Sequence, residues 1–127
     1  MGASAQQTLQ AFREADAYPG TSLVIAYSHC IAHGIDMEQG LKQQYRAVHS
    51  GYWPLLRYNP QLRELGEPPF QLDSQRATCD FAEYTQNELR YRMLRQTNPG
   101  QADELMAMAE EHIAKRWMLY EQLAQIR

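Results

Sequence analysis

The clearest hydrophobic pattern in the chain lies in residues 22–27, SLVIAY, which have no polar face. The run is short, rich in branched side chains, and follows Pro19 and Gly20. A short continuous apolar run is typical of a strand buried on both faces, and a buried helix is the alternative interpretation. The preceding proline and glycine and the short length favour the strand. The pattern therefore predicts one strand, over residues 22–27, that is buried on both faces.

Two capping-box pairs mark the starts of two predicted helices, one on each side of this strand. Ser4 with Gln7 opens the first helix, which ends at YPG, residues 18–20. Asp36 with Gln39 opens the second helix. The apolar residues of the second helix recur at helical spacing and mark one face: Met37, Leu41, Tyr45 and Val48.

The second half of the chain changes character. Residues 52–60, YWPLLRYNP, and residues 68–72, PPFQL, are predicted to be extended and could pair as a short antiparallel ribbon, although their prolines favour edges or loops. From Asp80 onward the spacing is helical, and Asn98 and Pro99 restart the helix with a cap residue and a proline at its first position. The last helix carries a long apolar stripe: Ala102, Leu105, Met106, Ala109, Ile113, Trp117, Tyr120 and Leu123.

These patterns predict an α/β class with a boundary near residues 73–80. Residues 1–79 have helix, buried strand, helix and short extended segments, and residues 80–127 form a helical tail. A strand buried on both faces needs neighbouring strands for its backbone hydrogen bonds and helices over its sheet. The chain offers the helices but no second strand of the same character. We infer that the other strands of the sheet lie elsewhere, in more of the same polypeptide or in another subunit.

The loop after the predicted strand carries His29, Cys30 and His33. Ligand sites in open α/β sheets collect at the carboxyl ends of strands, so this loop is the first candidate site. The Cys30 thiol could be a nucleophile, a metal ligand or a small buried residue. A closed zinc site needs four ligands and a cubane cluster needs four thiolates, whereas the chain has one further cysteine, Cys79. Spacing alone leaves these alternatives open.

Composition limits the classes of function that remain open to the chain. The net charge of −3 and the sequence pI of about 5.8 give no electrostatic footprint for nucleic acid, and no apolar run is long enough to predict a membrane span. Two distant cysteines do not make a disulfide framework, which favours a reduced, cytoplasmic setting. Arg90, Arg92 and Arg95 are interpreted as solvated charges on a helix face. No phosphate-binding glycine loop occurs, so the chain's own residues do not complete an active site.

Long motifs give a specific resemblance. The stretches GTSLVIAYSHCIAHGIDM, GLKQQYRAVHSGYWPLLRYNP and PFQLDS closely resemble the C-terminal region of pyruvate:ferredoxin (flavodoxin) oxidoreductases, and NELRYRMLRQTNP in the tail is similar in pattern. The resemblance covers essentially the whole chain. It implies that residues 1–79 are the C-terminal part of a thiamine-diphosphate-binding α/β domain and that residues 80–127 are a C-terminal helical extension.

The resemblance also implies a chemistry for the complete enzyme. That family carries out the oxidative decarboxylation of pyruvate with coenzyme A, using thiamine diphosphate and magnesium, and passes electrons through [4Fe–4S] clusters to ferredoxin or flavodoxin. Cys30 matches the cysteine that binds the cluster nearest the thiamine. The other three thiolates and the thiamine and magnesium motif are absent from this chain, and Cys79 matches no family ligand. His29 and His33 flank the ligand, where they either shape its surroundings or pack.

We therefore expect a C-terminal fragment or subunit of such an oxidoreductase that is inactive alone. Its partners would be the remainder of the enzyme, within a homodimer, and ferredoxin or flavodoxin for the complete enzyme. One alternative is a helical interaction module that docks on an oxidoreductase without binding a cluster. Another is a small metal-binding or redox-sensing protein in which two chains pool Cys30 and Cys79.

Overall fold

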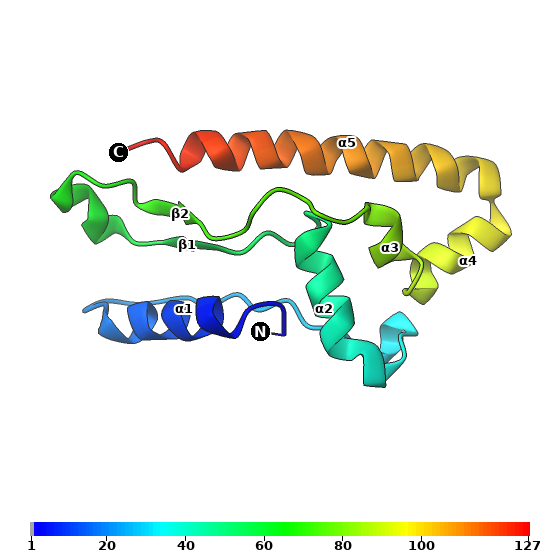
Figure 1. Cartoon of the computed structure of the whole chain (residues 1–127), viewed down its shortest axis with the longest axis horizontal. Coiled ribbons are helices and arrows are strands. Elements are labelled where there is room, and N and C mark those ends of the chain that lie inside the picture. The colour runs from blue at the N-terminus through cyan, green and yellow to red at the C-terminus, as the bar shows by residue number, and fades with distance from the viewer. Residues whose placement is uncertain (1) are drawn as a thin grey trace.

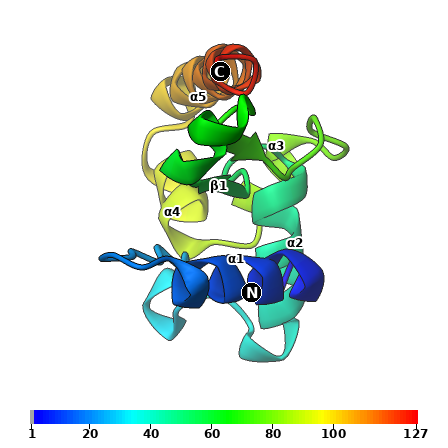
Figure 2. The same cartoon turned by 90° about the vertical axis from the view of Figure 1, so that its left-hand side faces the viewer.

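The computed structural model describes residues 2–127 and arranges them in three tiers (Figure 1). The long helix α5, Pro99–Leu123, forms one outer tier, and α1, Ala5–Ala17, forms the other. Between them lies a hairpin of two strands, β1, Leu56–Tyr58, and β2, Phe70–Leu72. The view along the length of the molecule keeps this order, with α5 and α1 on opposite sides (Figure 2).

Six shorter helical elements complete the middle of the chain. The helix α2, Gly40–His49, follows two single turns of 3₁₀ helix at Ile31–His33 and Met37–Gln39. A longer 3₁₀ helix, Pro60–Leu65, connects the two strands. The helices α3, Phe81–Thr85, and α4, Leu89–Thr97, then lead into α5. Among the described residues no helix is both long enough and apolar enough to cross a lipid bilayer.

The predicted antiparallel ribbon is confirmed. In the hairpin Leu56 pairs with Leu72 and Tyr58 pairs with Phe70. Each strand is only three residues long. Proline has no N–H to donate to a ladder, so Pro54 and Pro60 confine the first strand to the residues between them.

The predicted helix starts are confirmed at both outer helices. The Ser4 hydroxyl accepts a hydrogen bond from the Gln7 backbone N–H at 3.2 Å, and the Asn98 side chain accepts one from Gln101 at 3.3 Å. The capping box of α1 is only half formed, because the Gln7 side chain donates instead to Asp73 on the hairpin, at 3.0 Å. Gln7 thereby fixes α1 to the hairpin rather than to its own first turn.

The expected apolar face of α2 is not the face that this chain buries. Asp36 caps the short 3₁₀ turn before α2, and Met37, Leu41 and Tyr45 are exposed. The buried residues of α2 include Gln43 and Ala47. Gln43 is buried because its amide donates to backbone and side-chain oxygens of the tail, and Ala47 is small enough to allow close approach.

The predicted strand over residues 22–27 is wrong for this chain as it stands. The segment is extended, yet no backbone hydrogen bond involves residues 21–29 within residues 2–127. Leu23 is 83% exposed and Ile25 is 71% exposed. The physical reason is the lack of a neighbour, because the two hairpin strands pair with each other. The α/β class is corrected accordingly: the described residues form a mostly helical domain with a two-strand antiparallel hairpin.

The hydrophobic core lies where α2, α3 and α5 meet. Its buried residues are Ala47, Phe81, Tyr84 and Met106. Partly buried aromatic and aliphatic side chains surround it: Tyr27, Tyr52, Trp53, Tyr91, Ala109 and Ile113. Residues from both sides of the predicted boundary near 73–80 therefore share one core.

Candidate functional site

Cys30 stands on the surface at the end of the extended segment. It is the residue before the 3₁₀ turn Ile31–His33, and its backbone carbonyl accepts a hydrogen bond from His33 N–H at 2.9 Å. Gly34 ends the turn in the left-handed conformation, with φ of +62°, which glycine adopts without strain. The Cys30 side chain is exposed. The sequence therefore fixes the backbone of this loop while leaving the thiol accessible.

The two histidines beside Cys30 differ in their surroundings. His29 Nδ1 lies 3.0 Å from Gln44 Nε2 on α2, and the His29 ring packs so closely on Gly40 that a Cβ there would have no room. His33 Nδ1 is buried without a hydrogen-bond partner among the described residues. In residues 2–127 no cluster of three or more His, Cys, Asp or Glu side chains could hold a metal ion.

Cys79 occupies a different environment. It is half-buried at the edge of a hollow between the segment before α3 and the middle of α5, which Cys30 does not line. Burial, followed by the charges of Glu83 and Asp80, raises the pKa of the Cys79 thiol. The structure thus does not place the two cysteines in one site.

An iron–sulfur cluster can be tested against this donor set. A cubane needs four thiolates, and the loop provides a single exposed one. Cys30 fits the role of one ligand, since its side chain reaches solvent and the turn around it fixes the backbone. The chain alone does not fit a complete cluster, so any further ligands must come from outside it.

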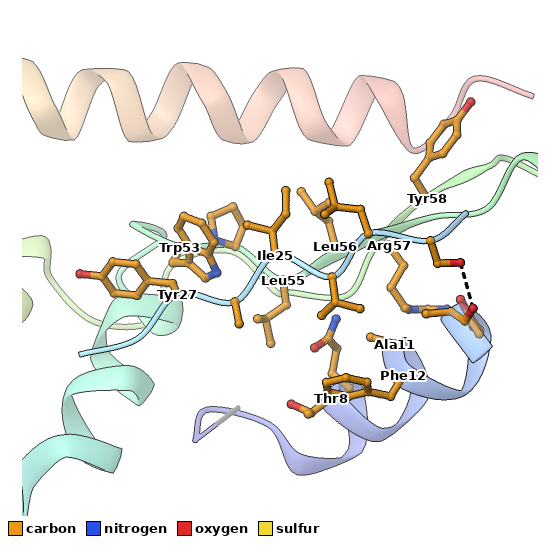
Figure 3. Close-up of a pocket in the computed structure, with 18 of the residues that line it drawn as sticks. Thr8, Ala11, Phe12, Ile25, Tyr27, Trp53, Leu55, Leu56, Arg57 and Tyr58 are labelled. Atoms are coloured by element: carbon orange, nitrogen blue, oxygen red, sulfur yellow. Dashed lines mark hydrogen bonds and ion pairs between the residues drawn. The ribbon is translucent and has the colours of Figure 1, made fainter. Parts of the chain in front are cut away.

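A hollow of about 700 Å³ lies beside the extended segment (Figure 3). Figure 3 shows the segment crossing between α1 and the first hairpin strand. The hollow is lined largely by apolar side chains from all three: Phe12, Leu23, Val24, Ile25, Leu55 and Leu56. An apolar segment with open backbone groups beside an apolar hollow is the arrangement of a sheet edge that lacks its neighbour.

Arg57 holds one wall of this hollow in place. Its guanidinium donates to both Asp73 carboxylate oxygens, each at 2.7 Å, and also contacts Glu14 on α1. The arginine side chain is only 14% exposed, so water screens these ion pairs weakly. Hydrogen bonding to Asp73 is the largest cause that raises the pKa of Arg57. The clamp joins α1 to the hairpin and preserves the open shape between them.

A polar network that the sequence interpretation missed connects the extended segment to the tail. Arg90 was expected to be solvated, but its guanidinium donates to the buried carboxylate of Glu88 at 2.6 Å and to the Tyr84 hydroxyl at 3.1 Å. Tyr84 and Glu88 are completely buried. The Tyr84 hydroxyl in turn lies 2.6 Å from that of Tyr27. The Arg90 side chain is still 43% exposed, as expected of a solvated charge. The network was missed because the helix breaks before Leu89, which turns Glu88 into the core.

These features are those of a folded segment with one exposed candidate ligand, and the described residues do not form a complete active site. The described residues combine a closed helical core, an apolar segment without backbone partners and one exposed thiol. No family model matches the chain. Individual proteins do match it, and all those described next are much longer.

The chain is similar to pyruvate oxidoreductases along essentially its whole length. It is 46% identical over 124 residues to the pyruvate-flavodoxin oxidoreductase of a Nostoc species and 48% identical over 126 residues to a putative one of Synechocystis. It is 44% identical over 125 residues to the pyruvate:ferredoxin oxidoreductase of Moorella thermoacetica. Each alignment covers 98% of this chain, and 10% to 11% of the relative. The chain is therefore homologous to a segment of pyruvate-flavodoxin and pyruvate:ferredoxin oxidoreductases, and it spans about a tenth of their length.

Proposed function

We propose that this chain is a C-terminal piece of a pyruvate:ferredoxin or pyruvate:flavodoxin oxidoreductase that works only with the remainder of the enzyme. The observation that carries the proposal is the open segment over residues 22–27, in a chain homologous to a tenth of each relative. An apolar strand needs backbone partners and cover, and about nine-tenths of each homologous enzyme lies outside the matched segment and could supply them. The isolated chain is expected to be inactive.

The two parts of the chain receive separate roles in this proposal. Residues 1–79 would form the end of the thiamine-diphosphate-binding domain, and residues 80–127 would be the helical extension. The core contains residues from both parts: Ala47, Phe81, Tyr84 and Met106. The helical extension would therefore also stabilise residues 1–79, which carry the Cys30 loop. Thiamine diphosphate, magnesium, pyruvate and coenzyme A would be bound by the remainder of a homodimeric, cytoplasmic enzyme, which would pass electrons to ferredoxin or flavodoxin.

Cys30 would supply one thiolate ligand to a [4Fe–4S] cluster. When bound, such a cluster supplies one-electron transfer. The contribution of this chain is to fix the backbone before and after the cysteine and to leave the thiol exposed toward the missing part. His29, bound to Gln44, and His33, beside the turn, would shape the surroundings of the ligand without joining it.

Anaerobic reconstitution tests this role. The chain is co-expressed with a full-length relative from which the homologous segment has been deleted, and the complex is incubated with iron and sulfide. Electron paramagnetic resonance and iron content are then compared for the unmodified chain, Cys30→Ser and the matched control Cys79→Ser. We expect Cys30→Ser to lack one cluster signal and Cys79→Ser to retain it. Equal cluster content in the two variants would exclude Cys30 as a ligand.

The same experiment separates a second candidate function. This second candidate is a helical module that docks on the enzyme without contributing a ligand, and its support is the shared helical core that residues of α2, α3 and α5 form. That function predicts stable association of the complex and no loss of cluster signal in Cys30→Ser. Cluster formation by the chain alone would support a small metal or redox-sensing protein and contradict both.

A further inference from the structure

Tyr27 differs from the rest of the extended segment that it ends. Leu23 and Ile25 are exposed, whereas Tyr27 is half-buried. Its ring stacks on Trp53, with 5.1 Å between centroids (Figure 3). It also makes an edge contact with Tyr52, with 6.0 Å between centroids. Such aromatic pairs stabilise a structure beyond the area they bury. The chain is thus anchored at the point where the open segment ends, three residues before the cysteine.

The hydroxyl of Tyr27 is held by the tail. It lies 2.6 Å from the Tyr84 hydroxyl, which accepts a hydrogen bond from Arg90 Nη2 at 3.1 Å. Arg90 Nε donates to Glu88, whose carboxylate also accepts from the Gln43 amide at 3.3 Å. Hydrogen bonds in a buried network strengthen one another, and those to charged groups are the stronger kind. Each member therefore restricts the positions available to Tyr27.

The phenols remain protonated over the ordinary range of pH. Burial is the largest cause that raises the pKa of Tyr84, followed by hydrogen bonding to Glu88 and Tyr27. Burial is also the largest cause that raises the pKa of Tyr27. The hydroxyl-to-hydroxyl contact therefore persists as a neutral hydrogen bond and does not open on mild changes of pH.

The far side of the cysteine loop is also held by the tail. Arg92 Nη2 donates to the Gly34 carbonyl at 3.1 Å. Leu89 packs so closely on Gly34 that a side chain at this position would collide with it. Because His29 is bound to α2 in the middle of the loop, residues 27–34 are fixed at both ends and once between them.

We propose that Tyr27, Tyr84, Arg90 and Glu88 form a tyrosine latch, whose members are positioning residues that set the location of the Cys30 thiol. The inference rests on the proposed function, because placement of the thiol matters only if it meets a ligand outside the chain. A ligating group has to be held to within about half an ångström of its working position. The latch makes the C-terminal tail, rather than the open segment, responsible for that placement.

A nitroxide label on Cys30 measures this placement directly. The full chain carries Cys79→Ser, so that the exposed Cys30 is the single labelled site, and the label mobility is read from the electron paramagnetic resonance spectrum. We expect a restricted spectrum in this background and a several-fold shorter rotational correlation time after Tyr84→Phe, which removes the hydroxyl that lies 2.6 Å from that of Tyr27 and leaves only the longer contact of 3.5 Å between Tyr27 and Arg90. The matched control Tyr58→Phe removes an exposed hairpin hydroxyl and should leave the spectrum unchanged.

Two further measurements keep the test decisive. Tyr27→Phe removes the same contact from the loop side and spares the buried Tyr84, so it replaces Tyr84→Phe if that variant fails to fold by circular dichroism. A label at Glu104→Cys on α5, in a chain lacking both natural cysteines, reports general loosening. Mobilisation at residue 30 alone supports the latch. An unchanged spectrum in folded Tyr27→Phe, or equal mobilisation at both sites, overturns it.

The label experiment uses the chain without any cluster and is independent of the reconstitution result. A mobile label in Tyr27→Phe together with unchanged cluster content in Cys30→Ser would refute the proposed function and leave the latch standing. An immobile label together with loss of the cluster in Cys30→Ser would refute the latch alone.

Discussion

The core around Tyr84 and the hollow beside Ile25 meet at Trp53, which contacts both. On the core side, Tyr84 is completely buried and its hydroxyl is hydrogen bonded to Tyr27 and Arg90. On the hollow side, Ile25 is 71% exposed, and residues 21–29 make no backbone hydrogen bond within the described chain. Both regions contain large apolar side chains. Their difference lies in whether this chain supplies the partners for their polar groups.

This contrast explains how one small chain can be both folded and incomplete. The Glu88 carboxylate accepts hydrogen bonds from both the Gln43 amide and Arg90, so the helical part can bury this carboxylate beside its apolar side chains. The segment at residues 22–26 has no such partners, and an apolar strand cannot be buried with its N–H and C=O groups unpaired. In our proposal the remainder of the enzyme supplies the backbone partners of this segment.

The largest expected effect comes from truncating the core. Phe81 is 5% exposed, and we expect Phe81→Ala to lower the free energy of unfolding by about 3–5 kcal/mol, because it leaves a cavity. Ile25→Ala, in the open region, should cost less than about 0.5 kcal/mol. Urea denaturation followed by circular dichroism compares the two variants. Equal costs would remove the distinction between the closed and the open region.

Removing the buried carboxylate should have the next largest effect. Glu88→Ala removes one of the two acceptors of the buried Gln43 amide and the carboxylate partner of Arg90, and we expect a loss of about 1–3 kcal/mol in unfolding free energy. Glu64→Ala, on the exposed connection between the strands, is the matched control and should be close to neutral. If Glu88→Ala and Glu64→Ala lower the unfolding free energy equally, the polar network does not stabilise the core.

The clamp that keeps the hollow open should contribute less. Arg57→Met removes partly buried ion pairs to Asp73 and Glu14, with an expected loss of about 1–2 kcal/mol. Arg76→Met breaks the exposed pair with Glu121 and should lose under about 0.5 kcal/mol. Thermal denaturation of both variants measures the difference.

The pH dependence of the clamp has a definite sign. The folded state raises the pKa of Arg57, so the contribution of this cation is complete below the ordinary pKa of arginine and falls only as the pH rises through the raised value. The stability difference between the unmodified chain and Arg57→Met should therefore stay constant from about pH 6 to about pH 9. A decline within that interval would show that another group controls the clamp.

The smallest effect concerns the reactivity of the two thiols. Cys30 is exposed, whereas Cys79 is half-buried and its pKa is raised, first by burial. Because the thiolate is the reacting form, Cys79 should react several-fold more slowly with a disulfide reagent near neutral pH and should accelerate as the pH rises. Single-cysteine variants give the two rates. Faster reaction at Cys79 than at Cys30 would contradict the claim that Cys30 is the accessible thiol.

Local signals in the sequence predicted the parts that depend on neighbours along the chain. Ser4 and Asn98 cap their helices as expected, and the prolines around residues 56–58 and 70–72 confined the strands to a short hairpin. The resemblance to pyruvate oxidoreductases is confirmed by homology along the chain. These features depend on a few adjacent residues or on long continuous motifs.

Features that depend on distant partners could not be predicted from the sequence. Gln43 and Glu88 are 45 positions apart, and nothing in either surrounding pattern indicates that they meet in the core. The break before α4 brought Arg90 into the network, although its helical spacing indicated a solvated charge. The apolar run at residues 22–27 and the lack of a second strand of its kind led to the inference that its partners lie elsewhere, and the segment has no backbone–backbone hydrogen bond among the described residues. The role of Cys30 as a ligand stays a prediction.

Amide hydrogen exchange of residues 22–26 tests the central claim most directly. The exchange rates are measured in the isolated chain and again after addition of the full-length relative from which the homologous segment has been deleted. The account predicts rapid exchange in the isolated chain, because these N–H groups have no partner, and strong protection in the complex. Protection in the isolated chain, or rapid exchange in a complex that has demonstrably formed, would contradict it.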